Sequence, residues 1–238
     1  TSGENSAGPT IGLIRNDTTT VTGNVLGTFG FGHTDGSPDF PEQTPQQLPA
    51  SIRAVAAESM GSGDDGANME FYTKPINANK DVSSTLNMKI ANDGSVTMPN
   101  QPAILASSSS IQTFSSTATA TALTLGTTDL SRGNLTRSGN NLTVPVTGYY
   151  VFHYAVAANI FTDIRAFGVR LYKNGSSFQA HNYHAAVHNG GGAATHYQFT
   201  GTFLASLAAS DYVTLYGILY DSTSNINFQT QINGYLIG

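Results

Sequence analysis

The sequence predicts an all-β chain that ends in an antiparallel sandwich or jelly roll, and three observations support this prediction. Charged residues are 11% of the 238 residues, against about 25% in ordinary soluble domains, which argues against a long exposed helix. Thr, Ser, Asn and Gly replace the missing charge, and these residues favour short strands and tight turns. Apolar and polar residues alternate in runs, with no amphipathic helix between the runs of the second half, as is typical of half-buried strands.

Composition also argues against several classes of function. The chain has no Cys, which excludes a disulfide scaffold, a Cys-ligated zinc site and a thiol nucleophile. Its formal net charge is −5, whereas nucleic-acid binders show basic stripes, so we expect no nucleic-acid partner. No run of about 18 apolar residues occurs, so we expect no membrane insertion. The chain begins at Thr1 without Met, and we expect it to be the C-terminal piece of a longer protein.

The chain divides into two parts where its charge changes, near residue 110. Residues 1–110 contain 11 acidic and 5 basic residues, whereas residues 111–238 contain 4 and 5. Pro99 and Pro102 precede a serine run at 107–110, and this pattern is typical of a linker or a domain boundary. We therefore predict a small, loop-rich β module at 1–103 and a larger β domain at 104–238.

The first part is predicted to contain five short strands separated by loops rich in Gly, Pro and Asp. The segment 54–60 fits either the end of a strand or one helical turn. No strand has enough apolar partners for a large core of its own, so we expect other copies of the chain to complete it. The expected strands are 10–15, 25–31, 51–56, 69–73 and 86–90.

The second part is predicted to contain longer strands. In 149–157, the residues Tyr150, Phe152, Tyr154 and Val156 alternate with a second set. The run 165–173 leads into Asn174-Gly175, which is the strongest short hairpin signal. Further strands are expected at 195–207, 211–220 and 225–237, a spacing that fits an antiparallel sandwich.

Four ordered motifs in the second part resemble the C1q/TNF-like jelly-roll family. They are the run 142–152 (LTVPVTGYYVF), the run 169–175 (VRLYKNG), 204–207 followed by 211–213, and 233–237 (NGYLI). The resemblance covers about residues 111–238, and Ser210 stands where Gly is usual. It implies a C1q/TNF-like jelly-roll head and a homotrimer with an aromatic-rich axis, in which the partners are two identical chains.

Residues 10–103 resemble the shaft-proximal β modules of bacteriophage tail fibres. The resemblance rests on runs at 26–32 (LGTFGFG), 51–54 (SIRA), 69–73 (MEFYT), 86–90 (LNMKI) and 93–103 (DGSVTMPNQPA). This order, followed by a C1q-like head, implies a phage receptor-binding fibre. We therefore expect a virion protein that joins the rest of the fibre and attaches to host cell-surface polysaccharide or lipopolysaccharide.

Loops of the second part are the expected binding sites, because a sandwich holds its loops in position. Tyr183 is the best candidate for stacking on a sugar ring, since Asn182 and two neighbouring histidines supply hydrogen bonds for hydroxyl groups. The candidate loops are 159–165, 181–194 and 221–225. Within them, the candidate receptor-binding residues are Thr162, Asp163, Arg165, His181, Asn182, Tyr183, His184, His188, Asp221 and Asn225.

Histidines and carboxylates leave two alternatives open. In a trimer, three copies of His184 or His188 near the axis are a candidate site for Zn²⁺, Ni²⁺ or Fe²⁺. We favour hydrogen-bonding residues on a loop instead, and we expect no cofactor. The acidic turn at 61–66 is a weaker candidate for Ca²⁺, because only two of its carboxylates are adjacent.

Enzymatic cleavage is the other alternative. A glycosidase needs two carboxylates facing the sugar, and Glu58, Glu70, Asp81 and Asp93 are available in the first part. The second part has only four Asp residues and no Gly-x-Ser-x-Gly motif to support a Ser-His-Asp triad. We therefore expect a non-enzymatic receptor-binding protein. Its rivals are a structural head-fibre or decoration protein, a polysaccharide-degrading fibre enzyme and a secreted C1q-type lectin.

Overall fold

The computed structural model is built from antiparallel strands. It describes residues 12–16, 19–32, 48–61, 63–79, 82–108, 110–114, 119–160, 166–184, 195–220 and 226–238. For 158–160, 166, 180–184, 195–197, 220 and 226 it describes the backbone alone. These ranges contain no helix, and accordingly none that is long and apolar enough to cross a membrane.

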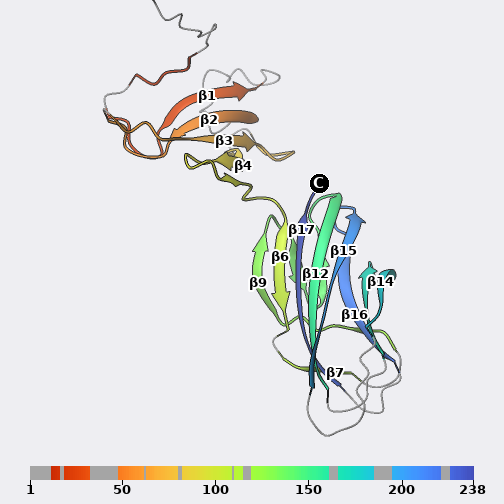
Figure 1. The fold of residues 1–238 in the computed structure, drawn as a ribbon. Coiled ribbons are helices and arrows are strands. Elements are labelled where there is room, and N and C mark those ends of the chain that lie inside the picture. The colour runs from red at the N-terminus through yellow and green to blue at the C-terminus, as the bar shows by residue number, and fades with distance from the viewer. Residues whose placement is uncertain are drawn as a thin grey trace, which may run out of the picture. The chain divides into compact units, whose positions relative to one another are not determined.

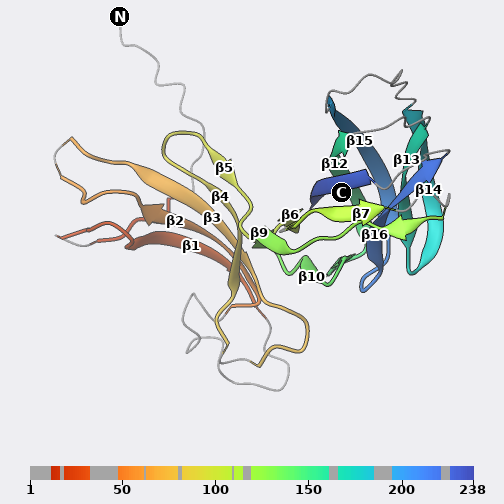
Figure 2. The same ribbon diagram turned by 90° about the horizontal axis from the view of Figure 1, so that it is seen from below.

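The chain forms two compact units, Thr1–Asn100 and Gln101–Gly238. The first unit contains one antiparallel sheet with the order β1-β2-β3-β4-β5 (Figure 2). Its strands are β1 (Val25–Phe31), β2 (Ala50–Ala56), β3 (Ala67–Thr73), β4 (Thr85–Ile90) and β5 (Val96–Thr97). Four of the five strands expected here are confirmed. The strand expected at 10–15 is wrong in its described part, because residues 12–16 form no strand. Between 54 and 56 the strand alternative holds, since β2 continues to Ala56.

The second unit contains two six-stranded antiparallel sheets (Figure 1). One has the order β10-β11-β16-β13-β14, with β8 paired to β16; the other has the order β15-β12-β17-β6-β9, with β7 paired to β17. The strands are β6 (Ala103–Ser107), β7 (Gln112–Phe114), β8 (Thr121–Ala122), β9 (Thr127–Arg132), β10 (Thr136–Ser138), β11 (Asn141–Thr143), β12 (Gly148–Ile160), β13 (Ala166–Lys173), β14 (Ser176–His184), β15 (Thr195–Leu207), β16 (Tyr212–Tyr220) and β17 (Ile226–Leu236).

The strand order of the second unit is that of a jelly roll, because strands that follow one another in sequence are distributed over two sheets. For example, β12 lies in one sheet, β13 and β14 in the other, and β15 again beside β12. The prediction of an all-β chain with a C-terminal jelly roll is therefore confirmed. Five of the six long strands from 148 to 236 follow the expected ranges closely, whereas β14 and the shorter strands β6 to β11 were not predicted individually.

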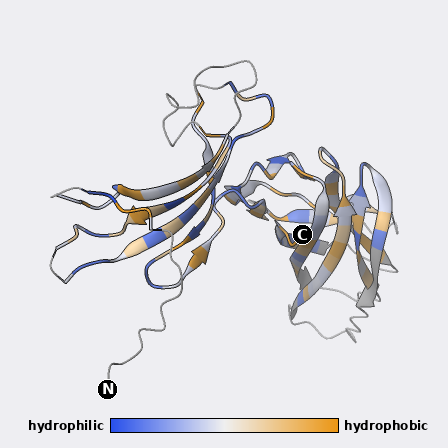
Figure 3. Cartoon of the chain, turned by 90° about the horizontal axis from the view of Figure 1, so that it is seen from above, coloured by the Kyte–Doolittle hydropathy of each residue, from blue (hydrophilic) through white to orange (hydrophobic). Residues whose placement is uncertain are grey.

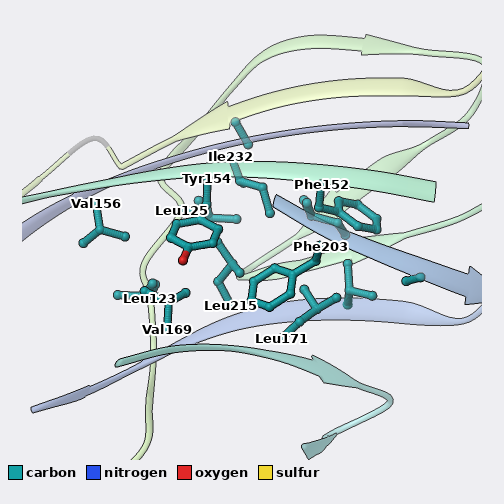
Figure 4. Close-up of a cluster of buried hydrophobic side chains, with 14 of the residues drawn as sticks. Leu123, Leu125, Phe152, Tyr154, Val156, Val169, Leu171, Phe203, Leu215 and Ile232 are labelled. Atoms are coloured by element: carbon teal, nitrogen blue, oxygen red, sulfur yellow. The ribbon is translucent and has the colours of Figure 1, made fainter. Parts of the chain in front are cut away.

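The core of the second unit lies between its two sheets and is built by alternation. Tyr150, Phe152, Tyr154 and Val156 of β12 all point inward and are almost fully buried. Across the core they meet the apolar residues of β13 and β16, as Figure 4 shows for Val169, Leu171 and Leu215. Four aromatic rings pack at the same depth, with Phe114 and Phe228 edge to face and Phe167 stacked on Phe228, 4.5 Å between ring centres. Phe199 lies 5.0 Å from Phe167.

The hairpin expected at Asn174-Gly175 is confirmed. Asn174 and Gly175 have φ angles of 50° and 79°, the left-handed values that a two-residue type I′ turn requires. Asn tolerates this region and Gly enters it freely. The turn therefore sets the register in which β14 folds back along β13.

Candidate functional site

The strand ends that flank the three candidate binding loops lie at one end of the second unit. Strand pairing brings them together: Ile160, the last residue of β12, pairs with Thr195, the first of β15. Likewise Ala166, the first residue of β13, pairs with Tyr220, the last of β16. Asn159 pairs with Asn227, next to the start of β17. All three candidate loops therefore leave the sandwich at the same end, although they are far apart in the sequence.

The chain enters and leaves this unit at the opposite end. Ala103 at the start of β6 pairs with Tyr235 near the C-terminus, and Gly148 at the start of β12 pairs with Leu207 at the end of β15. The C-terminus is marked at this end in Figure 1. The long strands thus separate the connection to the rest of the chain from the end that carries the candidate loops.

The candidate residues themselves are described only in part. Thr162, Asp163, Arg165, His188, Asp221 and Asn225 lie outside the described residues. His181, Asn182, Tyr183 and His184 belong to β14, and for these four residues only the backbone is described. The loop expected at 181–194 is therefore wrong for its first four residues. The reason is the length of the hairpin, since β14 pairs with β13 as far as His184 opposite Phe167.

A register shift lies between the two histidines of β14, His181 and His184. Val169 pairs with His181 and Phe167 pairs with His184, so two steps along β13 correspond to three along β14. This is a β-bulge, which inserts one extra residue into one strand. In a regular strand, residues three apart would pair with positions on opposite sides of β13. Because of the bulge, both histidines instead pair with positions of β13 that belong to the same side, Val169 and Phe167.

One side of the β15-β12-β17-β6-β9 sheet faces away from the core, and we call it the outer face. It presents polar side chains whose contacts the structure describes. His153 lies at its centre, with Nδ1 2.7 Å from Thr202 Oγ1 and Nε2 3.4 Å from Tyr235 Oη. The imidazole and the Tyr235 ring are 5.9 Å apart, centre to centre. His153 is thus held from both neighbouring strands.

A shallow hollow of about 390 Å³ lies over this histidine. A second hollow of about 260 Å³ continues it along the sheet and shares Ala155 and Gln231 with it. Both hollows are lined by residues of β12 together with Thr, Gln or Asn residues of β15 and β17. The first hollow is lined by Leu105, His153, Tyr154, Ala155, Thr200, Gly201, Thr202, Gln231 and Asn233.

The chemistry of these hollows is hydrogen bonding to neutral groups. Hydroxyl and amide groups both donate and accept, and a histidine does the same through its two ring nitrogens. None of the residues that line either hollow is Asp, Glu, Lys or Arg. The hollows therefore offer no carboxylate pair for acid–base cleavage of a glycoside, but they suit hydroxyl groups or the amide groups of another protein surface.

The described carboxylates from the glycosidase alternative make local contacts. Glu58 accepts a hydrogen bond from the Gly66 amide at 2.7 Å. Glu70 accepts one from the Tyr72 hydroxyl at 2.6 Å. Asp93 accepts one from the Ser95 amide at 2.8 Å, and this bond lowers the pKa of Asp93 below its ordinary value. These bonds organise turns and strands; Asp81, also considered for this role, lies outside the described residues.

Asp211 belongs to a turn at the end of the second unit opposite the candidate loops. Its carboxylate accepts hydrogen bonds from Lys173 Nζ at 2.8 Å, Asn174 Nδ2 at 2.7 Å and the Ala208 amide at 2.8 Å. The Lys173 ammonium, followed by the other two donors, lowers the pKa of Asp211 to about 2. The carboxylate is therefore a structural anion that ties the β13–β14 turn to the start of β16.

Metal binding has no described cluster to support it. Within the described ranges, no group of three or more His, Asp or Glu residues is placed to hold an ion. In the acidic turn at 61–66, Gly61 pairs with Asp64 as an isolated bridge. The axial metal alternative rests on His184, whose side chain is not described, and on His188, which lies outside the described residues.

Comparison with known proteins gives a fold likeness alone. No family model and no curated protein sequence matches the chain. Among solved structures, the chain is similar to the globular domain of zebrafish complement 1qA protein, with 13% identity over 58% of this chain and 98% of that one and a TM-score of 0.40. It is also similar to murine APRIL, with 14% identity, 56% and 98% coverage and a TM-score of 0.39. The jelly roll itself follows from the strand order of the second unit. The likenesses to a C1q domain and a TNF-family protein agree with that fold and show no family, and nothing in them points to a phage tail fibre.

Sequence reasoning did not single out His153, although a signal for it was present. The alternation in 149–157 places the residue on the side opposite Phe152 and Tyr154, which makes His153 a hydrogen-bonding group on the outer face of a long strand. The contacts with Thr202 and Tyr235 depend on strands that begin more than forty residues away, so the sequence pattern could not supply them.

Proposed function

We propose that this chain is the tip of a trimeric receptor-binding fibre on the virion of a bacterial virus, and that it attaches to host cell-surface polysaccharide or lipopolysaccharide without cleaving it. The observation that carries the proposal is the separation of the two ends of the second unit. The start of β6 and the end of β17 lie at one end, and the strand ends that flank all three candidate loops lie at the other. A fibre tip needs this arrangement, because its receptor lies beyond the far end.

The outer face supports self-association of the second unit. Its described part nearest the C-terminus is apolar and exposed: Tyr149 is 56% exposed, Leu204 52% and Leu130 51%. Val151 pairs with both Leu204 and Tyr235, so these side chains form one cross-strand row. Exposed apolar patches of this kind mark protein interaction sites. Two identical chains are the proposed partners, and three joined copies convert weak single-site binding into avidity.

The proposal is tested by binding to immobilised bacterial polysaccharides. The probes are purified lipopolysaccharides and capsular polysaccharides from a panel of bacteria, and the sample is the full chain with its mass measured in solution. We expect a trimer that retains at least one polysaccharide without releasing reducing ends. A folded trimer that retains none contradicts the proposal and favours the structural head-fibre or decoration role. Release of reducing ends contradicts it in favour of a fibre enzyme.

A matched pair of variants in one strand then locates the site. Asn182→Ala with Tyr183→Ala changes the end of β14 near the candidate loops, and Ser177→Ala with Phe178→Ala changes the same strand near its hairpin. We expect the first variant to weaken polysaccharide binding about tenfold, equivalent to about 1.4 kcal/mol, and the second to bind as the parent does. Equal effects of the two variants would place the site elsewhere.

A further inference from the structure

The sheet of the first unit is apolar on its exposed face and polar on its buried face. Paired residues of neighbouring strands share one face of a sheet, so the register defines each face as a set of cross-strand rows. One face, here called the apolar face, has three described rows, and hydropathy alternates accordingly along the strands in Figure 3. These rows are Phe29–Ile52–Phe71–Met88, Gly27–Ala54–Met69–Ile90–Val96 and Phe31–Ala50–Thr73–Thr85.

The opposite face is polar and already covered within the unit. Arg53 is 3% exposed and Glu70 8%. The Arg53 guanidinium donates to Ser51 Oγ and to Ser84 Oγ, both at 3.1 Å. Leu48 covers the same side, because its side chain occupies the space next to Gly30. Among the described residues of this unit, the hydrogen-bonded network is therefore buried, whereas Phe29, Phe31, Met69 and Val96 on the apolar face stay exposed.

The size of the apolar face points to an interface. Phe29 is 59% exposed, Phe31 52%, Met69 42% and Val96 54%. With about 200 Å² for a fully exposed aromatic or long apolar side chain, these four expose about 400 Å². The half-buried members of the rows add to this area. Two such faces brought together bury about 1,000 Å², the size at which a specific protein interface becomes plausible.

The composition of the apolar face points to another copy of the same chain. Its three described rows contain no charged residue, so the identical faces of the three copies meet without the repulsion that like charges impose on self-association. Ala50 and Ala54 provide shallow positions between the large Phe29, Phe31 and Met69 side chains, whereas Leu13 of the same chain lies against Gly27. Large side chains of one face can therefore enter the shallow positions of another, as in a packed core.

We propose that the apolar face of the first unit is a second self-association surface, on which the first units of neighbouring copies pack to build a shared core. The inference rests on the homotrimer of the proposed function, but it concerns a different unit and a different surface. Edge-to-face contact between Phe29 and Phe31, 5.1 Å between ring centres, already orders the large side chains that this core requires.

Single cysteines test the proposal, because the chain has none of its own. Val96 and Thr97 are neighbours on β5 that are both exposed and lie on opposite faces. In the full-length oligomer we expect V96C to be alkylated at least about tenfold more slowly than T97C, since reaction at a covered site requires opening. After a long incubation that allows for this slow opening, M69C should be joined to another copy by a bis-maleimide, whereas I76C, at a position that is 91% exposed in a loop, should not.

The outcomes separate this inference from the proposed function. An oligomer in which V96C and T97C react equally fast overturns the inference and leaves the receptor-binding proposal standing. Slow alkylation of V96C without linkage of M69C means that something other than another copy covers the face, which also overturns it. A monomeric mass in solution overturns the homotrimer, whereas loss of polysaccharide binding with the predicted cysteine results overturns the receptor-binding proposal alone.

Discussion

The guanidinium carbon of Arg53 lies 3.9 Å from the ring centre of Tyr72, within the buried face of the first sheet. Tyr72 in turn donates its hydroxyl to Glu70 at 2.6 Å, and Lys89 lies 4.0 Å from the other oxygen of that carboxylate. Cation, ring and anion thus form one connected network across β2, β3 and β4. Its contacts join the side chains of three strands that are already paired through their backbones.

Removing the buried cation should unfold the first unit selectively. Arg53→Ala leaves Glu70 without one of its two neighbouring cations and removes the hydrogen bonds that Ser51 and Ser84 accept, so we expect a loss of about 2 kcal/mol or more in the free energy of opening. Amide hydrogen exchange in β1 to β4 measures it, with β12 and β17 as internal controls. Tyr72→Phe, which keeps the ring and removes one hydroxyl, should cost about 1 kcal/mol. Equal exchange in Arg53→Ala and the parent would contradict this role.

Two tyrosines should titrate late. Burial, and then the hydrogen bond to Glu70, raise the pKa of Tyr72 to about 12, and burial raises the pKa of Tyr154 to about 12. The folded state favours the neutral phenols, so their contribution to stability is fully present below pH 10 and is lost as the pH rises toward 12. An ultraviolet titration should show a late class of tyrosines that shrinks in Tyr72→Phe and in Tyr154→Phe. Titration of all tyrosines together near pH 10 would be inconsistent with this environment.

Acid should weaken the turn around Asp211. Its pKa is lowered to about 2, first by Lys173, so the carboxylate contributes stability above about pH 4 that is lost as the pH falls toward 2. Because the turn is partly exposed, Asp211→Asn should cost only about 1 kcal/mol at neutral pH. The difference from the parent should vanish near pH 2 in denaturant unfolding. Asp129→Asn, at a carboxylate that accepts a bond from the Ser107 hydroxyl, is the control and should change stability less.

Gly234 should tolerate no side chain. A Cβ at this position would lie 2.5 Å from two ring atoms of Phe152, which is fully buried. Gly234→Ala should therefore displace the ring and cost about 2 kcal/mol through overpacking. Thermal unfolding of the second unit measures it. Gly238→Ala is the control, because no atom lies within 4 Å of a Cβ there; similar losses in both variants would refute the packing argument.

A charge on the outer face should weaken the proposed trimer. Leu204 is 52% exposed and lies in the apolar row with Val151, so Leu204→Glu would bury three unpaired carboxylates if this row is an interface. We expect a fall to monomer mass at micromolar concentration, with strand structure retained in the circular dichroism spectrum. Phe178→Glu, at an exposed residue of β14 in the other sheet, should keep the parent mass. A trimer that survives Leu204→Glu would move the interface away from this face.

Much of the fold was predictable because it is encoded locally. The alternation in 149–157 set which residues of β12 enter the core, and Asn174-Gly175 set a turn that needs two left-handed residues. The strand at 10–15 was predicted on the same kind of pattern and is absent over 12–16. A short alternating run becomes a strand only when a neighbouring edge is available for hydrogen bonding, and this condition is not local.

The candidate site was less predictable than the fold. Loop residues such as Thr162 and Asp221 were chosen by composition alone, and they lie outside the described residues. For His181 to His184, the loop prediction was wrong because the hairpin runs four residues further than its composition indicates. The shared end of the three loops could not be predicted, since it depends on pairings such as Ile160 with Thr195 and Ala166 with Tyr220.

By itself, the sequence determined the fold class, the low charge and the sorting of each strand into two faces, because alternation acts between immediate neighbours. Only the tertiary structure decided which face is covered. In β12 the aromatic face is buried, as the pattern predicted, but in β2 and β3 the face that carries Arg53 and Glu70 is buried and the face that carries Met69 is exposed. An alternation with a period of two assigns the residues of a strand to two faces, but it does not determine which face is buried. Burial follows from what other segments supply, here hydrogen-bond partners such as Ser84 from a neighbouring loop.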